Sequence, residues 1–244
     1  MRDSLVIIPT YNEKENIKAI IQKVFSTSSQ AHVLIVDDGS PDGTADIVKS
    51  LQQEFPERLH LIERKGKLGL GTAYIAGFRY ALDRGYEYVF EMDADFSHNP
   101  LDLPKLYLEC KENGSDLAVG SRYKNGVNVV NWPMKRVLMS YFASKYVRMV
   151  TGMPIHDATA GFVCYRRGLL QSLHLDKVKF VGYAFQIEMK FAAWRKGYKV
   201  EEVPIVFTER THGQSKMSFK IFKEAFFGVI EIKLKSLFRP ISSY

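Results

Sequence analysis

Short apolar runs alternate with amphipathic stretches along the first half of the chain. The apolar runs predict buried strands at residues 5–8, 33–36, 59–62, 88–92 and 117–119. The stretches between them predict helices at residues 13–25, 44–55, 71–84 and 101–112. Strands that alternate with helices indicate a mostly parallel sheet that is covered on both faces.

The second half of the chain is less regular. Its pattern predicts helices at 133–150, 184–196 and 218–237, and strands at 162–165 and 200–207. No linker rich in Pro, Gly or Ser separates the halves, so we expect one continuous α/β domain. Residues 216–244 predict an amphipathic helical segment, which packs either on the domain or on a membrane surface.

Composition narrows the class of protein. With 46% hydrophobic and 25% charged residues, the 244-residue chain is not of a disordered type. The net charge of +7 favours polyanionic partners, but the basic residues form no continuous stripe, which argues against nucleic acid. Cys110 and Cys164 lie in no metal-binding or redox spacing, so we expect a reducing compartment. We also expect no secretory signal and no transmembrane helix.

Two carboxylates follow the fourth predicted strand. Ligands on open α/β sheets bind beyond the carboxyl ends of the strands, where Asp93 and Asp95 stand. Strand alternation would point both side chains the same way, with Ala94 opposite. Two carboxylates that point the same way repel each other unless a cation neutralises them. Oxygen ligands favour Mg²⁺ or Mn²⁺. A solvated acidic loop is the alternative.

Other strand ends carry candidate nucleotide-binding groups. Tyr11 is placed to stack on a base and Glu13 to accept ribose or base hydrogen bonds, unless Asn12 only caps the next helix. Asp37 and Asp38 offer further acceptors, whereas Asp42 is equally explained by an Asx turn or a helix cap. The basic, glycine-rich stretch 64–71 suits a diphosphate, with a surface loop as the alternative.

Arginines near turns form the last candidate group. Arg122 follows a strand end, Arg136 and Ser140 share one helix face, and Arg210 precedes Lys216 in a polar stretch. Guanidinium forks suit phosphate, so these residues predict a phosphate site unless they are ordinary surface residues.

Taken in order, these motifs resemble the dolichol-phosphate (polyprenol-phosphate) mannosyltransferases, inverting enzymes of GT-A type in glycosyltransferase family 2. The resemblance covers nearly the whole chain and rests on residues 9–13, 36–44, 67–74, 92–95, 120–123, 157–162, 185–189 and 210–216. It implies a single GT-A (Rossmann-like) α/β domain over 1–215 with a mostly parallel mixed sheet flanked by helices. Its donor half would cover about 1–122 and its acceptor half about 123–215.

The resemblance also implies residue roles. Asp93 and Asp95 would ligate Mg²⁺ or Mn²⁺, and together with Arg122 and Arg210 they would form the catalytic set. The implied donor-binding residues are Pro9, Tyr11, Glu13, Asp38, Lys67, Asp93, Ala94, Asp95, Arg210 and Lys216. The implied acceptor-phosphate residues are Arg122, Arg136, Ser140 and Arg210. Ser97 stands where some relatives place a Gln ligand, so a water molecule is the alternative third ligand.

The implied reaction joins GDP-mannose and polyprenyl (dolichyl) phosphate to give polyprenyl phosphate mannose and GDP. A phosphate monoester is largely a dianion at neutral pH, so no side chain is expected to act as an obligatory base. The implied partners are these two substrates, the cytoplasmic face of a membrane to which the protein is peripheral, and a small membrane-anchor subunit. Three alternatives stay open: a polyprenyl-phosphate glucosyltransferase using UDP-glucose, a polysaccharide-building transferase, and a non-catalytic lipid-phosphate-binding subunit.

Overall fold

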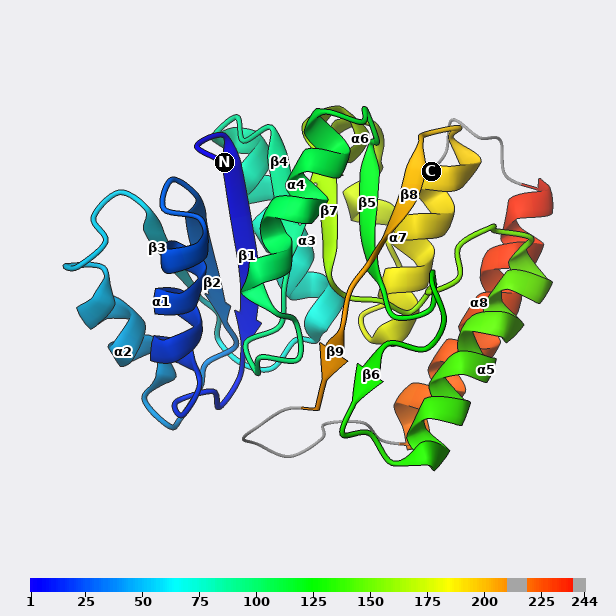
Figure 1. The fold of residues 1–244 in the computed structure, drawn as a ribbon, viewed down its shortest axis with the longest axis horizontal. Coiled ribbons are helices and arrows are strands. Elements are labelled where there is room, and N and C mark those ends of the chain that lie inside the picture. The colour runs from blue at the N-terminus through cyan, green and yellow to red at the C-terminus, as the bar shows by residue number, and fades with distance from the viewer. Residues whose placement is uncertain (210–218, 239–244) are drawn as a thin grey trace.

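The computed structural model describes residues 1–209 and 219–238. Its main sheet has seven strands in the order β3-β2-β1-β4-β7-β5-β8, with helices on both faces (Figure 1). These strands are β1 Ser4–Thr10, β2 His32–Asp37, β3 Leu59–Glu63, β4 Tyr88–Glu91, β5 Leu117–Ser121, β7 Val163–Arg166 and β8 Val200–Pro204. The short strands β6 Val129–Val130 and β9 Phe207–Thr208 pair with each other.

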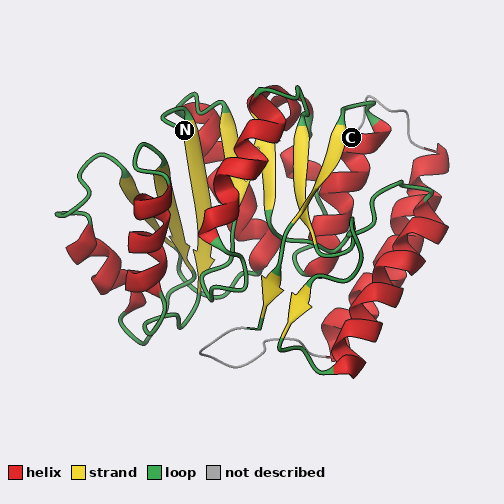
Figure 2. Ribbon diagram, in the orientation of Figure 1, coloured by secondary structure: helices red, strands yellow, loops and turns green. Residues whose placement is uncertain are grey.

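Helices occupy most of the segments between these strands (Figure 2). They are α1 Ile17–Thr27, α2 Thr44–Leu51, α3 Leu70–Asp83, α4 Leu103–Lys111, α5 Met134–Thr151, α6 Arg167–Ser172, α7 Tyr183–Arg195 and α8 Phe219–Phe238. Short 3₁₀ turns lie at Pro100–Asp102 and Leu175–Lys177. Among the helices described, none combines the length and the apolar character that crossing a membrane requires.

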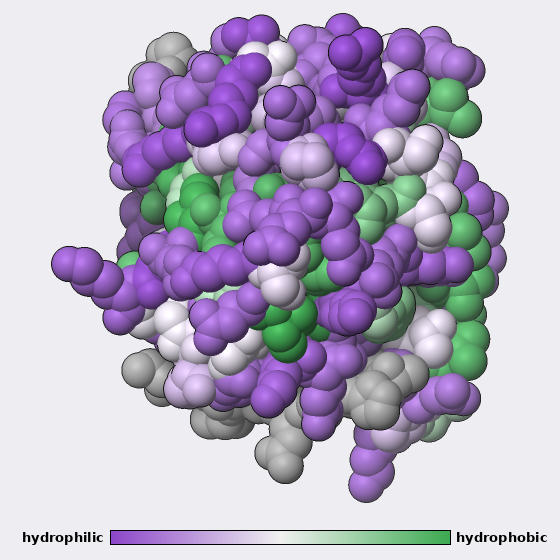
Figure 3. Space-filling view, turned by 90° about the vertical axis from the view of Figure 1, so that its left-hand side faces the viewer, coloured by the Kyte–Doolittle hydropathy of each residue, from purple (hydrophilic) through white to green (hydrophobic). Residues whose placement is uncertain are grey.

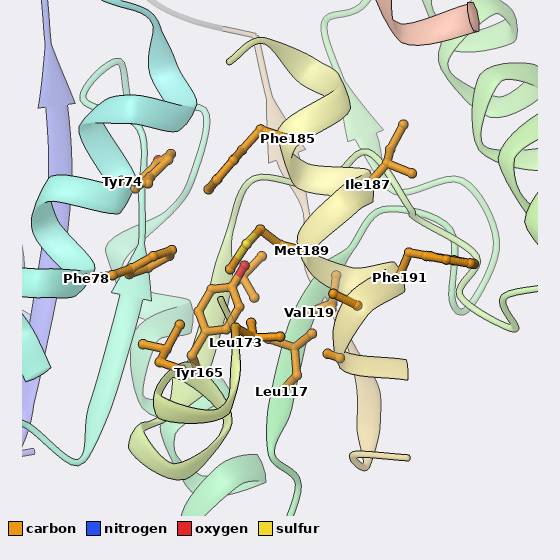
Figure 4. Close-up of a cluster of buried hydrophobic side chains, with 14 of the residues drawn as sticks. Tyr74, Phe78, Leu117, Val119, Tyr165, Leu173, Phe185, Ile187, Met189 and Phe191 are labelled. Carbon is orange, nitrogen blue, oxygen red and sulfur yellow. The ribbon is translucent and has the colours of Figure 1, made fainter. Parts of the chain in front are cut away.

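Side-chain alternation along β1 divides the core into two layers. Leu5 and Ile7 pack in the cluster that includes α3 and α7, whereas Val6 and Ile8 pack in the cluster that includes α1 and α4. Figure 4 shows the first cluster, in which the Tyr74 and Phe185 rings stack at 6.0 Å between centroids. This double coverage explains why the strands are nearly continuous apolar runs.

One antiparallel strand determines what lies at the functional edge. All other pairings in the main sheet are parallel, but β7 runs antiparallel to both β4 and β5. Its first residue, Val163, is paired with Glu91 and with Val119, near the carboxyl ends of those two strands. The segment 157–162, which leads into β7, therefore arrives beside the residues that follow β4 and β5.

The two ends of the sheet are covered differently. Figure 3 views the molecule from the β3 end, where hydrophilic residues dominate the face and hydrophobic ones gather near its centre. Beyond the other end, α8 packs against α5 and α7 (Figure 1). The Tyr146 ring of α5 stacks on Phe226 of α8 at 4.7 Å between centroids, and its hydroxyl donates to the Phe226 carbonyl at 2.9 Å.

The predicted single α/β domain with a mostly parallel mixed sheet is confirmed, but several element boundaries were wrong. The first helix begins at Ile17, not at residue 13, and β4 ends at Glu91, before the two aspartates. The strand predicted at 200–207 splits after Pro204 into β8 and β9. Strand β6 and helix α6 were not predicted, because runs this short carry no clear periodicity.

Candidate active site

A cavity of about 440 Å³ opens at the carboxyl edge of the sheet and extends between α5 and α8. Its charged and polar lining includes Asp93, Ser97, His98, Arg122, Arg136, Ser140, Thr159 and Gln186. Its apolar lining includes Met139, Phe142, Ala143, Val147, Ile187, Ala225, Phe226 and Val229. The predicted metal residue Asp93 and the predicted phosphate residues Arg122, Arg136 and Ser140 therefore share one cavity.

The two aspartates are placed differently from each other. Asp93 lines the cavity, and its side chain is 40% exposed. Asp95 is only 8% exposed, is not among the lining residues, and accepts a hydrogen bond from the Ser97 backbone N–H at 3.1 Å. The interpretation by strand alternation was wrong, because β4 ends at Glu91 and the aspartates lie in the turn that follows.

This turn suits a hard divalent cation that is shared with a substrate. Within residues 1–209 and 219–238, no three His, Cys, Asp or Glu side chains gather as a metal-binding group. Mg²⁺ and Mn²⁺ are commonly held by one or two carboxylates plus substrate phosphates and water. His98 Nδ1 accepts the Asp93 backbone N–H at 3.0 Å, which commits that nitrogen to the backbone. Asp93 and Asp95, two residues apart in this turn, offer carboxylate oxygens of the kind that such a cation takes.

His98 is a buried neutral imidazole. It is 3% exposed and stacks on Phe162 at 5.0 Å between ring centroids. Burial lowers the pKa of His98 to about 4, although the Asp95 charge opposes this shift. The imidazole therefore stays uncharged at neutral pH and supports the turn that carries Asp93.

We expect acid to destabilise the protein through His98. Between pH 6.5 and about 4 the unfolded chain binds a proton at this site and the folded chain does not, so stability falls as the pH falls through this window. The full effect is about 3 kcal/mol. Denaturant unfolding at several pH values should show a flatter acid slope for His98→Gln, which keeps an acceptor but does not titrate. An equal slope in both proteins would contradict this assignment.

The residues predicted to bind the nucleotide lie near the same edge of the sheet but outside the cavity lining, namely Pro9, Tyr11, Glu13, Asp38 and Lys67. Pro9 belongs to β1, and the Lys67 ammonium lies over the Tyr11 ring at 4.9 Å. Asp38 is ion-paired with Arg64 and accepts the Leu68 backbone N–H at 3.3 Å. Asp38 therefore holds the basic, glycine-rich loop close to the end of β2.

Hydrogen bonds show which interpretation of Asp42 and of Asn12 is correct. Asp42 Oδ1 accepts the Thr44 N–H at 3.0 Å, which confirms the Asx turn. Asn12 does not cap α1: it has a φ of +57°, and its N–H donates to Ser40 Oγ at 3.0 Å. The buried Asp37 accepts from Thr10 and Ser40, so it braces the turn rather than offering free acceptors to a ligand.

Arg122 is held by a buried carboxylate. Its Nε and Nη2 donate to the two oxygens of Asp157 at 2.7 and 2.6 Å, and its Nη2 also donates to Thr159 at 3.0 Å. The Arg122 guanidinium also lies 5.2 Å from the centroid of the Tyr123 ring. The Arg122 ion pair holds the pKa of Asp157 below its usual value against the opposing effect of burial. Arg122 is therefore a charged group fixed at the cavity wall.

Arg136 is the more exposed of the two cavity arginines. Its side chain is 27% exposed, pairs with Glu209 and lies over the Trp132 ring at 4.0 Å. Ser140 lies one turn further along α5, as the sequence spacing predicted. The two arginines and Ser140, the residues predicted to bind phosphate, therefore line the same cavity as Asp93.

Sequence reasoning missed the residues that support this site, namely Trp132, Asp157 and His98. Asp157 belongs to the motif at 157–162, but nothing in the spacing of that motif indicates a partner 35 residues away. Ala94 is buried at 4% exposure. Arg210, predicted for both substrates, and Lys216, predicted for the donor, lie outside the described residues.

Comparison with known proteins agrees with this geometry. The family model for glycosyl transferase family 2 matches residues 5–173. A polyprenol monophosphomannose synthase of Mycolicibacterium smegmatis is 49% identical over 93% of this chain and 86% of its own length. An undecaprenyl-phosphate mannosyltransferase of Micrococcus luteus is 45% identical over 91% of this chain and 90% of its own.

Solved structures share the fold at low sequence identity. Glucosyl-3-phosphoglycerate synthase from Mycobacterium tuberculosis, in complex with Mn²⁺, UDP and glucosyl-3-phosphoglycerate, has a TM-score of 0.68 at 18% identity, over 97% of this chain and 80% of its own. A mannosyltransferase from Pyrobaculum calidifontis in complex with GDP-Man and Mn²⁺ has a TM-score of 0.59 at 18% identity, over 94% of this chain and 69% of its own. These similarities confirm the predicted GT-A fold.

Proposed function

Because the chain belongs to glycosyl transferase family 2, we propose that it transfers mannose from GDP-mannose to a polyprenyl (dolichyl) phosphate, giving polyprenyl phosphate mannose and GDP. The observation that carries this proposal is the cavity. Asp93, Arg122 and Arg136 line it, and the side chains that α5 and α8 contribute to it are mostly apolar. A ligand with a phosphate head and a hydrocarbon chain matches that lining.

The residues would share the chemistry as follows. A divalent cation on Asp93 and Asp95 would neutralise the donor diphosphate and favour its departure. Arg122 and Arg136, with Ser140, would hold the acceptor phosphate, whose dianion attacks the anomeric carbon in line and inverts it. Arg210 is proposed to contact both substrates. The reaction needs no protein base, because the attacking oxygen is already ionised at neutral pH.

The remaining donor contacts are proposed for the first half of the chain, about 1–122. Pro9, Tyr11, Glu13, Asp38 and Lys67 would surround the nucleotide, with Ala94 beside the diphosphate. Lys216 is proposed to reach the donor phosphates. The position of the first five at the ends of β1 and β2 and in the adjoining loops supports this, since ligands bind beyond the carboxyl ends of such strands.

The polyprenyl chain of the acceptor would run along α5. Cavity residues Arg136, Ser140, Ala143 and Val147 recur at helical spacing, and the lining changes from polar to apolar along them. The distance from the first to the last is about 16 Å along the helix axis, at about 1.5 Å per residue. The site therefore suits the phosphate and the first part of a polyprenyl chain.

Filling the apolar part of the cavity tests this orientation. We expect Ala143→Trp to raise the KM for polyprenyl phosphate about tenfold or more, because the indole occupies the space of the chain and each lost CH₂ contact costs about 0.8 kcal/mol. GDP binding in Mn²⁺ should not change. Ala19→Trp, the same substitution at an exposed position of α1, is the matched control. Equal KM values for both variants would show that the polyprenyl chain binds elsewhere.

We further propose that α5 and α8 lie on the cytoplasmic face of a membrane, where a small membrane-anchor subunit would assist attachment. Apolar side chains are exposed on both helices, among them Phe142 at 56%, Met149 at 77% and Leu237 at 64%. Lys145 and Arg148 of α5 add positive charge beside them. Such a surface suits peripheral binding to anionic lipid.

Vesicle flotation tests the membrane surface. We expect the protein to float with vesicles that contain anionic lipid, and Met149→Glu with Leu237→Glu to reduce the bound fraction at least about tenfold, because burying one such side chain contributes about 1.5–3 kcal/mol. Leu108→Glu with Leu101→Glu, at apolar residues of 43% and 53% exposure on and before α4, is the control. If the control pair reduces binding equally, α5 and α8 are not the membrane face.

Labelled-sugar transfer to a short polyprenyl phosphate tests the proposed reaction. We expect labelled lipid from GDP-mannose with Mn²⁺ or Mg²⁺, none after chelation, and little from UDP-glucose. Transfer from UDP-glucose alone would identify the enzyme as a glucosyltransferase. No transfer from either donor, in a protein that still binds polyprenyl phosphate, would favour a non-catalytic binding subunit.

A further inference from the structure

Three buried polar side chains, one of which lines the cavity, take no part in the chemistry proposed above. Glu91 ends β4, and Gln186 and Lys190 lie one turn apart on α7. Their exposed fractions are 0%, 2% and 0%. Burying charged groups such as Glu91 and Lys190 is costly, and apolar residues of similar size often give an equally stable protein. Stability alone therefore does not account for these residues.

A directed chain of hydrogen bonds joins them. The Tyr165 hydroxyl donates to one oxygen of Glu91 at 3.0 Å, and the Gln186 amide donates to the other. The Lys190 ammonium donates to Gln186 Oε1 at 3.3 Å, to the Gln186 carbonyl at 3.2 Å and to the Ala160 carbonyl at 2.6 Å. These contacts use all three donors of the ammonium.

The chain of hydrogen bonds ends in the two halves of the site. Glu91 stands two residues before Asp93. Ala160 belongs to the segment 157–161, whose Asp157 side chain holds Arg122. Gln186 lines the cavity between these ends. Helix α7 thus links the metal-side turn to the segment that fixes the phosphate-side arginine.

We infer that Gln186 and Lys190 are positioning residues that fix Arg122 relative to Asp93, an inference that rests on the function proposed above. Strand β4 is fixed by its pairing in the sheet, but 157–161 lies outside helices and strands, so side-chain contacts decide its position. Alignment matters here because a misplacement of about 1 Å between reacting groups lowers a rate about 100-fold.

A double substitution distinguishes the positioning of Arg122 from a general contribution to the stability of the fold. Lys190→Met alone leaves the Glu91 carboxylate buried without a counter-charge, so it is expected to unfold at a lower temperature. Glu91→Gln combined with Lys190→Met removes both charges. The amides at 91 and 186 then satisfy each other, and Tyr165 keeps an acceptor. The Lys190 bonds to the Ala160 and Gln186 carbonyls are lost, and of these two only the bond to Ala160 reaches the segment 157–161.

We expect the double variant to have a Tm close to that of the wild type but a kcat lower by roughly ten- to a hundredfold. The KM for GDP-mannose should not change, because the nucleotide contacts lie on β1, β2 and their loops. Without any ligand, hydrogen exchange at amides 157–161 should be about tenfold faster, while the amides of α1 exchange as in the wild type. Leu106→Ala, a buried core change in α4, is the control that lowers Tm without altering kcat or this exchange.

A double variant with wild-type kcat, or with wild-type exchange at 157–161, overturns the inference. An unchanged kcat would mean that the hydrogen bonds of Gln186 and Lys190 do not determine how Arg122 and Asp93 are aligned. Unchanged hydrogen exchange would mean that these bonds do not hold the segment 157–161 in place. If the wild type itself transfers no mannose, the proposed function fails, and the exchange measurement alone still decides whether Lys190 fixes the segment.

Discussion

Asp93→Asn is expected to lower mannose transfer by roughly 10³-fold, a loss of several kcal/mol of transition-state stabilisation. The amide has nearly the shape of the carboxylate but lacks its charge, so the cation and the diphosphate lose their main protein anchor on the cavity wall. The Asp93 backbone N–H still donates to His98 Nδ1, so the turn keeps its support. The fold should therefore remain, and the loss should appear in kcat and in the concentration of Mn²⁺ needed for half-maximal rate.

Asp46→Asn is the matched control for this experiment. Asp46 is also an aspartate, its side chain is 83% exposed on α2, and it only approaches Lys49 at 3.9 Å. Exposed pairs of this kind contribute about 0–1 kcal/mol, so transfer should be unchanged. If Asp93→Asn retains wild-type turnover with a normal Tm, the aspartate turn does not hold the cation and the proposed chemistry has to be abandoned.

The sequence predicted the parts of the fold that depend on local pattern. Apolar runs such as the one in β1 are buried on both faces of the sheet, and this alone indicates parallel strands under helices. The reversal of β7 was not predictable, because nothing in four residues of strand encodes the direction of its neighbours. That reversal is what carries the segment 157–162 to the functional edge.

In the candidate site, too, the sequence predicted what depends on local pattern and missed what depends on tertiary contacts. Asp93, Arg122 and Arg136 were predicted because each follows a strand end or stands on a helix face, and the structure brings all three to one cavity. Their supports were not predicted. Asp157 is joined to Arg122 through tertiary contacts alone, and neither residue's local pattern specifies the other. Candidate groups can be predicted from residue type and position, whereas their placement relative to one another depends on tertiary packing.

Arg122 and Arg136 should respond differently to the same substitution. Arg122→Ala leaves the Asp157 carboxylate, which is 0% exposed, without its counter-charge. Breaking a buried pair in this way costs about 3–5 kcal/mol, so we expect both a large fall in stability and a roughly 10³-fold loss of kcat/KM for polyprenyl phosphate. Asp157→Leu added to Arg122→Met should restore much of the stability but none of the transfer.

Arg136→Ala removes a guanidinium from the same cavity without stranding a buried charge, because its partner Glu209 is 27% exposed. Partly exposed pairs contribute about 1 kcal/mol or less, so denaturant unfolding should be nearly unchanged. The KM for polyprenyl phosphate should rise roughly ten- to a hundredfold, since a charged hydrogen bond to phosphate contributes about 1.5–3 kcal/mol. Arg136→Lys should restore only part of the lost affinity for polyprenyl phosphate, because an ammonium keeps the charge but cannot donate the two parallel hydrogen bonds of a guanidinium.

Equal losses of stability in Arg122→Ala and Arg136→Ala would show that burial does not distinguish the two arginines. Unchanged KM values in both variants would show that the acceptor phosphate does not bind in this cavity.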